Sequence, residues 1–214
     1  VNIGGAKNIL GCFRQPEFVI CDPEMLKTLP AEEYISGLSE LIKMGLIMDS
    51  SLFSTIEQNI ENIMNRNTDL MEYLISVSLN LKAGVVKKDE QETSGERMIL
   101  NFGHTFGHVI ESVAGLKHGY AVASGMVISA DMSVKKGMLD PAERDRIKNL
   151  LQRFGLLKEY NISPSVFEEM IMKDKKKQGN NISFVLLESL GKAVIRKMSL
   201  QEIMTLYNIL YGKY

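Results

Sequence analysis

The sequence predicts a mainly α-helical protein with little sheet. Apolar residues recur at helical spacing from about residue 30 to about residue 172, capping and turn residues separate one helical stretch from the next, and a strand-like period appears only near the C-terminus. No repeat or low-complexity tract interrupts this pattern. We therefore expect a multi-helix domain with one short strand near its N-terminus and a small β-hairpin near its C-terminus.

The first element expected is the strand. Residues 18–21 form a short apolar run after Pro16 that is closed by Asp22-Pro23, which is typical of a buried strand. A single strand needs a partner, and no second strand is predicted nearby. Together with the absence of an initiator Met, this leads us to expect further chain upstream.

The helices follow in order, each bounded by ordinary start and stop signals. Pro30, Asp49, Thr68, Pro141 and Ser163-Pro164 stand at expected starts, and Gly137 and Gly155 at expected stops. The polar segment 87–96, which has no apolar residue, separates the third helix from the fourth. The expected helices are 31–48, 52–64, 68–86, 97–113, 120–136, 141–155, 164–172 and 200–211.

The hairpin is expected just before the last helix. Residues 182–187 and 193–195 are rich in β-branched and aromatic side chains, and the turn-like segment 189–192 separates them.

Composition excludes several classes of function. The formal net charge of the 214 residues is -1, which gives no support for a nucleic-acid or acidic-membrane partner. No apolar run approaches the length of a membrane span. Two cysteines, Cys12 and Cys21, are too few for a disulfide framework, so a reducing, cytoplasmic location is the simpler expectation.

The three histidines of the chain are its strongest sign of chemistry. His104, His108 and His118 lie within 15 residues, and the first two are four apart, so a helix places them on one face. Imidazoles at this spacing form half of a site for zinc or a similar metal. The alternative is a polar helix face whose histidines are satisfied by hydrogen bonds.

Other polar residues could extend such a site. On one helix, Arg97 and Asn101 would share a face with His104 and His108, and this donor-rich stripe suits an anion or a metal. Glu40 is a candidate carboxylate ligand, although its spacing from Lys43 also fits an ordinary ion pair on a solvated face. The acidic run 89–92 could hide a general base and the lysine run 175–177 could reach a phosphate, but both are usually solvated charge runs. No phosphate-binding glycine motif for a nucleotide is present.

An ordered set of motifs resembles the 3-dehydroquinate synthase family. The resemblance covers nearly the whole chain, and the run from Asn101 to His108 is its most specific part. The matching residues are Lys7-Asn8-Ile9-Leu10-Gly11-Cys12-Phe13-Arg14-Gln15-Pro16, Leu29-Pro30, Gly37-Leu38-Ser39-Glu40-Leu41-Ile42-Lys43, Lys82, Asp89-Glu90-Gln91-Glu92, Arg97, Asn101-Phe102-Gly103-His104-Thr105-Phe106-Gly107-His108, His118-Gly119 and Asp174-Lys175-Lys176.

The resemblance implies a two-domain enzyme, of which this chain would be the second part. Residues 1–28 would be the tail of a dinucleotide-binding domain, and residues 29–214 the helical domain that binds metal and substrate. The full-length protein would be a homodimer that needs neither nucleic acid nor membrane. The family's glycines that bind NAD phosphates have no counterpart here, so we expect the chain alone to be inactive.

The resemblance also implies roles for particular residues. Glu40, His104 and His118 would bind Zn²⁺ or Co²⁺, which separates His104 from His108. Lys82 and Arg97 would hold a substrate carboxylate, and Glu92, Lys43 and His108 would act in catalysis, Glu92 as proton acceptor. The phosphate would contact Asn8, Asn101, His108 and one of Lys175 or Lys176, and NAD would contact Lys7, Met25, Leu26, Lys27 and Thr28. One departure is Tyr120, since the family usually has an acidic residue after His-Gly.

The activity implied is that of a lyase of the shikimate pathway of aromatic amino acid biosynthesis. It converts the sugar-acid phosphate 3-deoxy-D-arabino-heptulosonate 7-phosphate to 3-dehydroquinate and phosphate, with NAD and a divalent metal. Three alternatives are another sugar-phosphate cyclase, a metal-dependent alcohol dehydrogenase of the same superfamily, and a non-catalytic remnant domain.

Overall fold

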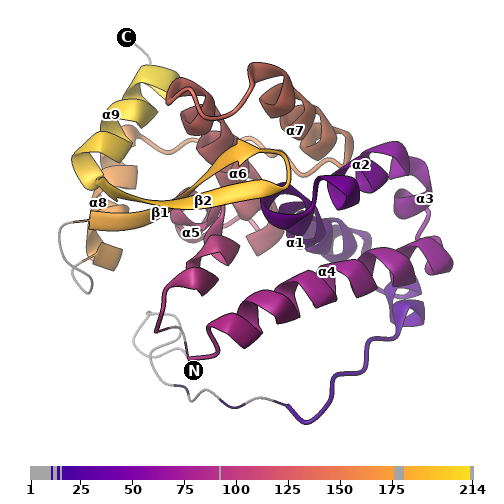
Figure 1. Ribbon diagram of the computed structural model, residues 1–214. Helices are drawn as coiled ribbons and strands as arrows, with labels where there is room; N and C mark the ends of the chain where they lie inside the picture. The colour runs from indigo at the N-terminus through magenta and orange to yellow at the C-terminus, as the bar shows by residue number, and fades with distance from the viewer. Residues whose placement is uncertain (1–10, 12–13, 15, 92, 176–180, 213–214) are drawn as a thin grey trace.

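The computed structural model describes residues 11, 14, 16–91, 93–175 and 181–212 (Figure 1). Two short 3-10 helices, η1 and η2, accompany the α-helices, and a two-stranded antiparallel hairpin precedes the last helix. In chain order the elements are η1 (Pro23–Lys27), α1 (Ala31–Met48), α2 (Ser50–Gln58), α3 (Ile60–Met64), α4 (Thr68–Lys88), η2 (Glu96–Asn101), α5 (His104–Ala114), α6 (His118–Lys135), α7 (Pro141–Arg153), α8 (Pro164–Lys175), β1 (Asn181–Ser189), β2 (Lys192–Ser199) and α9 (Leu200–Tyr211). The mainly helical class and the C-terminal hairpin are thus confirmed.

Side-chain caps fix several helix starts where the sequence predicts them. The Asp49 carboxylate accepts hydrogen bonds from the backbone N–H groups of Ser51 and Leu52, and Ser199 accepts one from Glu202. Asp140 caps α7, which has Pro141 at its first position. Such caps satisfy N–H groups that the helix leaves unpaired and stabilise it by about 1 kcal/mol each.

Helix α6 is the centre of the molecule. It packs against α1, α5, α7, α9 and β1, and Figure 1 shows the hairpin across the middle of the molecule beside it. Its side chains belong to both apolar clusters of the core. Val122 lies in the cluster built mainly with α1–α4 and α7. Ile128 lies in the cluster built with α5, α8, α9 and the hairpin. Almost all of its residues are therefore buried.

Glycines allow α5 and α6 to approach each other closely. A Cβ atom on Gly125 would lie 1.9 Å from the carbonyl oxygen of Gly103 and 2.8 Å from the nitrogen of Gly107. The start of α5 consequently lies directly against α6, which sets the relative position of the histidines that these two helices carry.

The hairpin covers α6 on its other side. Val185 pairs with Ile195 in its register, and the backbone N–H of Leu187 donates to Ser133 Oγ of α6 at 3.0 Å. Four consecutive residues of β1, 184–187, are buried, so both faces of this strand are covered.

Three expectations from the sequence are wrong in detail. The helix expected at 52–64 is interrupted at Asn59, which lies between α2 and α3. The helix expected at 97–113 is interrupted at Phe102 and Gly103, because Gly103 adopts a left-handed conformation (φ 80°) that ends the 3-10 helix η2 before α5 begins. Residues 18–21 form no buried strand: they lie outside any regular element and are exposed, Phe18 by 75% and Ile20 by 81%. The only sheet in the described part of the chain is the C-terminal hairpin, so nothing there pairs with them.

Among the described residues, no helix combines the length and apolar character that crossing a bilayer requires.

Candidate metal centre

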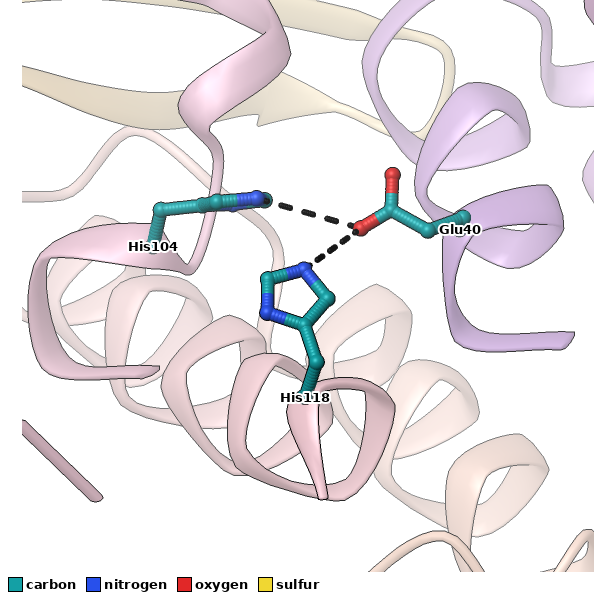
Figure 2. Close-up of side chains that lie close together, drawn as sticks. All are labelled: Glu40, His104 and His118. Atoms are coloured by element: carbon teal, nitrogen blue, oxygen red, sulfur yellow. Dashed lines mark ion pairs between the residues drawn. The ribbon is translucent and has the colours of Figure 1, made fainter. Parts of the chain in front are cut away.

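Three side chains of metal-ligand type converge from three helices. Glu40 lies on α1, His104 is the first residue of α5 and His118 the first of α6 (Figure 2). One ligand atom from each lies within 4.8 Å of the others. The Nε2 atoms of His104 and His118 are 3.8 and 3.6 Å from Glu40 Oε1, too far for hydrogen bonds and suited to ligands around a common ion.

Local structure explains the place of each histidine. The left-handed turn at Gly103 separates η2 from α5, which begins at His104, and the ring's Nδ1 lies 3.1 Å from the carbonyl oxygen of Phe102. His118 is fixed by the contact between α6 and α1, where the N–H of Gly119 donates to Ser36 Oγ at 3.1 Å. Glu40 is one helical turn beyond Ser36 and therefore faces His118.

The surroundings of Glu40 fit a bound cation. Its Oε2 accepts a 2.6 Å bond from Lys43, whereas its Oε1 is buried and has no hydrogen-bond partner within the described part of the chain. A buried carboxylate oxygen without a partner is costly. A divalent ion between Oε1 and the two imidazoles would satisfy it, and two nitrogens with one carboxylate are a ligand set that zinc accepts.

The protonation states of Glu40 and His104 also suit metal binding. Burial, aided by the positive charge of Lys43, lowers the pKa of His104 to about 4, so its imidazole is neutral at neutral pH. Burial alone would raise the pKa of Glu40, but the proximity of His118 and Lys43 outweighs it and lowers the pKa to about 2. Contact with Glu40 raises the pKa of His118, which favours the protonated ring, so a metal ion binding there would have to displace that proton. An ionised carboxylate and a neutral imidazole are the forms that coordinate a metal.

A cationic cavity of about 630 Å³ adjoins the three ligands. Lys43 is almost fully buried beside it, and burial lowers the pKa of its ammonium group although Glu40 opposes the shift. This volume is within the range of small-molecule sites. The cavity is lined by the three ligands and by four further predicted site residues, namely Lys43, Lys82, Arg97 and Asn101.

Asp89 holds the loop that brings Arg97 to the cavity. Its Oδ1 accepts from the N–H of Ser94 at 3.0 Å and its Oδ2 from the N–H of Arg97 at 3.1 Å. These hydrogen bonds, foremost the one from Ser94, lower the pKa of Asp89. The sequence marked Asp89 only as part of an acidic run, so its role in shaping the loop was missed.

Other predicted residues lie outside the group of three ligands. The ring of His108 lies one turn further along α5 and beside both histidine ligands, with its centroid 5.3 Å from that of His104 and 6.3 Å from that of His118. Residues 25–28 lie in and after η1, which contacts the first residue of α4, whereas Lys82 lies near the other end of α4. They do not line the cavity, so their contact with NAD stays a prediction.

Several predicted site residues cannot be placed. Lys7, Asn8, Glu92 and Lys176 lie outside the described residues, and Lys175 is the last residue of α8. Their assigned roles stay predictions.

Two residues beside the ligands had no signal in the sequence. Glu111 of α5 lies 3.1 Å from His118 Nδ1 through its Oε2, and Ser36 receives the N–H of Gly119. Both contacts join different helices, and a pattern within one helix does not indicate them.

Two family models match the chain. Residues 37–177 match the family model described as 3-dehydroquinate synthase C-terminal, and residues 1–36 match the one described as 3-dehydroquinate synthase N-terminal. The chain belongs to the 3-dehydroquinate synthase family. The resemblance seen in the sequence is thereby confirmed.

Relatives in this family are similar over most of the chain. It is 44% identical over 200 residues to a 3-dehydroquinate synthase of Dictyoglomus thermophilum, covering 91% of this chain and 56% of the relative. It is 42% identical over 213 residues to one of Campylobacter jejuni subsp. doylei, covering 96% and 60%. The chain thus spans somewhat more than half the length of these relatives.

Solved structures share the fold at lower identity. A 2-deoxy-scyllo-inosose synthase complexed with carbaglucose-6-phosphate, NAD⁺ and Co²⁺ matches with a TM-score of 0.83 and 24% identity, over 100% of this chain and 61% of that one. A 2-epi-5-epi-valiolone synthase from Streptomyces hygroscopicus subsp. jinggangensis, with NAD⁺ and Zn²⁺ bound, matches with a TM-score of 0.79 and 23% identity, over 88% and 54%. The predicted dehydroquinate synthase-like fold is thus confirmed.

Proposed function

We propose that this chain is the metal- and substrate-binding part of a 3-dehydroquinate synthase, a lyase of the shikimate pathway. The observation that carries the proposal is the convergence of Glu40, His104 and His118 beside a cavity lined by Lys43, Lys82 and Arg97. We assign residues 29–214 to this part and residues 1–28 to the end of a dinucleotide-binding domain. The change from one family model to the other between residues 36 and 37 supports a division close to this point.

The proposed cofactors are NAD and Zn²⁺ or Co²⁺. The metal would be held by Glu40 Oε1 and the Nε2 atoms of His104 and His118, and NAD by the region of Lys7 and residues 25–28. When bound, the ion supplies a Lewis acid for substrate oxygens and NAD supplies reversible hydride transfer. The ligands named for the two sugar-phosphate cyclases of the same fold support this choice.

The proposed substrate is 3-deoxy-D-arabino-heptulosonate 7-phosphate. Two cations at the cavity, Lys82 and Arg97, suit its carboxylate, because a guanidinium group can bind both carboxylate oxygens. Asn101, His108 and Asn8, with Lys175 or Lys176, would hold the phosphate. Fixing both anionic ends orients the substrate across the ligands and lowers the entropic cost of reaction.

The proton and phosphate steps are assigned to residues of this chain. Glu92 would accept the proton of a C–H bond of the substrate. The electrons of that C–H bond form the new double bond as the C–O bond to phosphate breaks. The phosphate leaves with the electron pair of the broken C–O bond, beside the cationic residues that stabilise it. Lys43, held at Glu40 Oε2, would donate a hydrogen bond to a substrate oxygen near the ligands.

A second candidate is another sugar-phosphate cyclase, because both structural neighbours named above are cyclases of this kind. Lys82 and Arg97 together favour the carboxylate-bearing substrate over a sugar phosphate without a carboxylate. A homodimeric cytoplasmic enzyme that needs neither nucleic acid nor membrane fits either candidate.

The test is phosphate release by the protein as its gene encodes it, supplied with NAD and Zn²⁺. We expect one phosphate released per 3-deoxy-D-arabino-heptulosonate 7-phosphate consumed, with no net NADH, and a large loss in Arg97→Ala. Turnover of a sugar phosphate without a carboxylate, and none of this substrate, would favour the second candidate. Net NADH formation would indicate an alcohol dehydrogenase instead.

A further inference from the structure

Each histidine of the candidate metal centre is held through its Nδ1 atom. His104 Nδ1 lies 3.1 Å from the carbonyl oxygen of Phe102, and His118 Nδ1 lies 3.1 Å from Glu111 Oε2. In both rings the other nitrogen, Nε2, faces Glu40 Oε1. The same orientation is thus produced by a backbone acceptor at one ligand and by a side-chain acceptor at the other.

The contact between Glu111 and His118 depends on the turn between α5 and α6. Gly115 ends α5 in a left-handed conformation (φ 68°), and α6 begins at His118. This turn brings the first residue of α6 back to a carboxylate on the last turn of α5. The side chain of Glu111 is only 19% exposed, although that of His118 is 45% exposed, so the contact joins a largely buried carboxylate to a ring at the surface.

His118 needs such a contact more than His104 does. The side chain of His104 is 13% exposed, and packing restricts its ring, whereas that of His118 is 45% exposed. A neutral imidazole carries its proton on either nitrogen, and a hydrogen bond from Nδ1–H leaves the Nε2 lone pair free for a metal. An acceptor at Nδ1 therefore selects both the tautomer and the rotation of the ring that present Nε2.

Residue 120 does not supply this acceptor. Tyr120 stands where the family usually has an acidic residue, and its hydroxyl donates instead to the carbonyl oxygen of Glu32 at 3.2 Å. Within the described part of the chain, the carboxylates in contact with the His118 ring are those of Glu40, on the Nε2 side, and Glu111, on the Nδ1 side.

We propose that Glu111 is a positioning residue of the metal centre, which accepts the Nδ1–H of His118 and so presents its Nε2 atom to the ion. The inference rests on the proposed metal site of Glu40, His104 and His118. Glu111 itself is not a ligand in this assignment, since its carboxylate lies on the opposite edge of the ring.

The experiment measures Zn²⁺ affinity of the 214-residue chain by competition with a chromophoric chelator. We expect Glu111→Ala to weaken binding by about 10- to 100-fold, the usual effect of removing the partner of a ligating histidine. Glu111→Gln keeps an acceptor oxygen and is expected to lose less. The matched control is Glu33→Gln, which removes a negative charge paired with Lys117, the neighbour of His118. Its Zn²⁺ affinity is expected to stay within twofold of that of the unchanged chain.

A second measurement separates positioning from general damage to the fold. Nitrogen-15 NMR of the zinc-loaded chain is expected to show His118 protonated at Nδ1 in the unchanged chain and in Glu111→Gln. In Glu111→Ala this proton is expected to broaden through exchange with water, while the far-UV circular dichroism stays unchanged. If Glu111→Ala does not fold, the Zn²⁺ affinity of Glu111→Gln is compared with that of Glu33→Gln. A weaker affinity in Glu111→Gln supports the role of Glu111, and an equal affinity contradicts it.

The outcomes distinguish the inference from the proposed function. Wild-type affinity and an unchanged Nδ1 proton in Glu111→Ala, with binding lost in His118→Ala, would overturn the role of Glu111 and leave the metal site standing. Zinc binding that is equally tight in Glu40→Ala and His118→Ala would overturn the metal site and with it both proposals.

Discussion

At the scale of single residues, the two oxygens of Glu40 have different surroundings. Oε2 is bound by Lys43, and Oε1 is buried and faces two imidazole nitrogens. The lysine keeps the carboxylate ionised and turned, so that one oxygen remains for a metal. A carboxylate that binds with only one oxygen leaves room for substrate at the ion.

Zinc bound at Glu40 Oε1 should stabilise the folded chain. A ligand that binds only the folded state at 100 times its dissociation constant raises the free energy of unfolding by about 2.7 kcal/mol. We expect urea unfolding, monitored by circular dichroism with and without Zn²⁺, to show this gain, and a chelator to reverse it. The gain should vanish in Glu40→Ala, and an equal gain in that variant would contradict the assignment.

Tyr34 of α1 gives the stability a pH dependence that does not involve the metal ligands. Burial raises its pKa to about 12, and its hydroxyl donates to the carbonyl oxygen of Ile63 at 2.6 Å. Above pH 10 the unfolded chain loses this proton while the folded chain keeps it, so the contribution present below pH 10 is lost as the pH rises towards 12. Urea midpoints at pH 9 and pH 11 should differ less in Tyr34→Phe than in the unchanged chain. An equal difference in the variant and the unchanged chain would show that Tyr34 does not cause this pH dependence.

At the scale of elements, the crossing of α1 and α6 positions two of the three ligands. Gly119 lies against α1 so closely that a Cβ atom on it would be 1.9 Å from the carbonyl oxygen of Ser36. Glu40 and His118 face each other only because this crossing is tight. The helix pair is therefore as much a part of the site as the ligands are.

Replacing Gly119 with alanine should separate the two helices. We expect Gly119→Ala to lower the free energy of unfolding by about 1–3 kcal/mol through overpacking and to weaken Zn²⁺ binding. Gly37 on α1 is the matched control, because a Cβ atom there would meet nothing within 4 Å. Gly37→Ala should stabilise the chain by about 0.5–1 kcal/mol and leave Zn²⁺ affinity unchanged. Unfolding curves and chelator competition are measured on both variants. Unaltered Zn²⁺ affinity in Gly119→Ala would argue against a role of the α1–α6 crossing in positioning the ligands.

The limits of sequence prediction are clearest at this scale. The helix at 31–48 could be predicted because its period and its flanking Pro30 and Asp49 agree. The break at Gly103 could not, because the apolar period continues through it and the left-handed turn follows from packing against α6. The spacing of His104 and His108 favoured pairing those two. The structure brings His104 close to both His108 and His118, with ring centroids 5.3 and 5.4 Å apart, and of these two it is His118 that joins His104 and Glu40 in the group of ligand atoms. The sequence named Glu40 as a candidate among 26 acidic residues, but local pattern could not select it, because His104 and His118 lie more than 60 positions away; the family resemblance did so.

At the scale of the whole molecule, α6 connects the site to the rest of the core. His118 stands at its start, and thirteen residues later Asp131 binds Arg144 of α7 and Tyr211 of α9. At 1.5 Å per residue these two points are about 20 Å apart. The helix is thus fixed to α1 and α5 at one end and to α7 and α9 at the other, which holds the ligands on a rigid element.

The exposed residues 18–20 have a consequence for the behaviour of concentrated solutions. Phe18, Val19 and Ile20 are strand-forming, apolar and accessible, and a net charge of -1 provides little repulsion between molecules. We expect the purified 214-residue chain to scatter light increasingly with concentration, and Val19→Lys to reduce this scattering. Tyr73→Lys, which adds the same charge at an exposed aromatic residue of α4, should reduce it less. Equal effects would trace the change to charge alone. If Val19→Lys reduces the scattering more, the colloidal behaviour of the protein is set by three residues at one end of a chain whose proposed chemistry lies elsewhere.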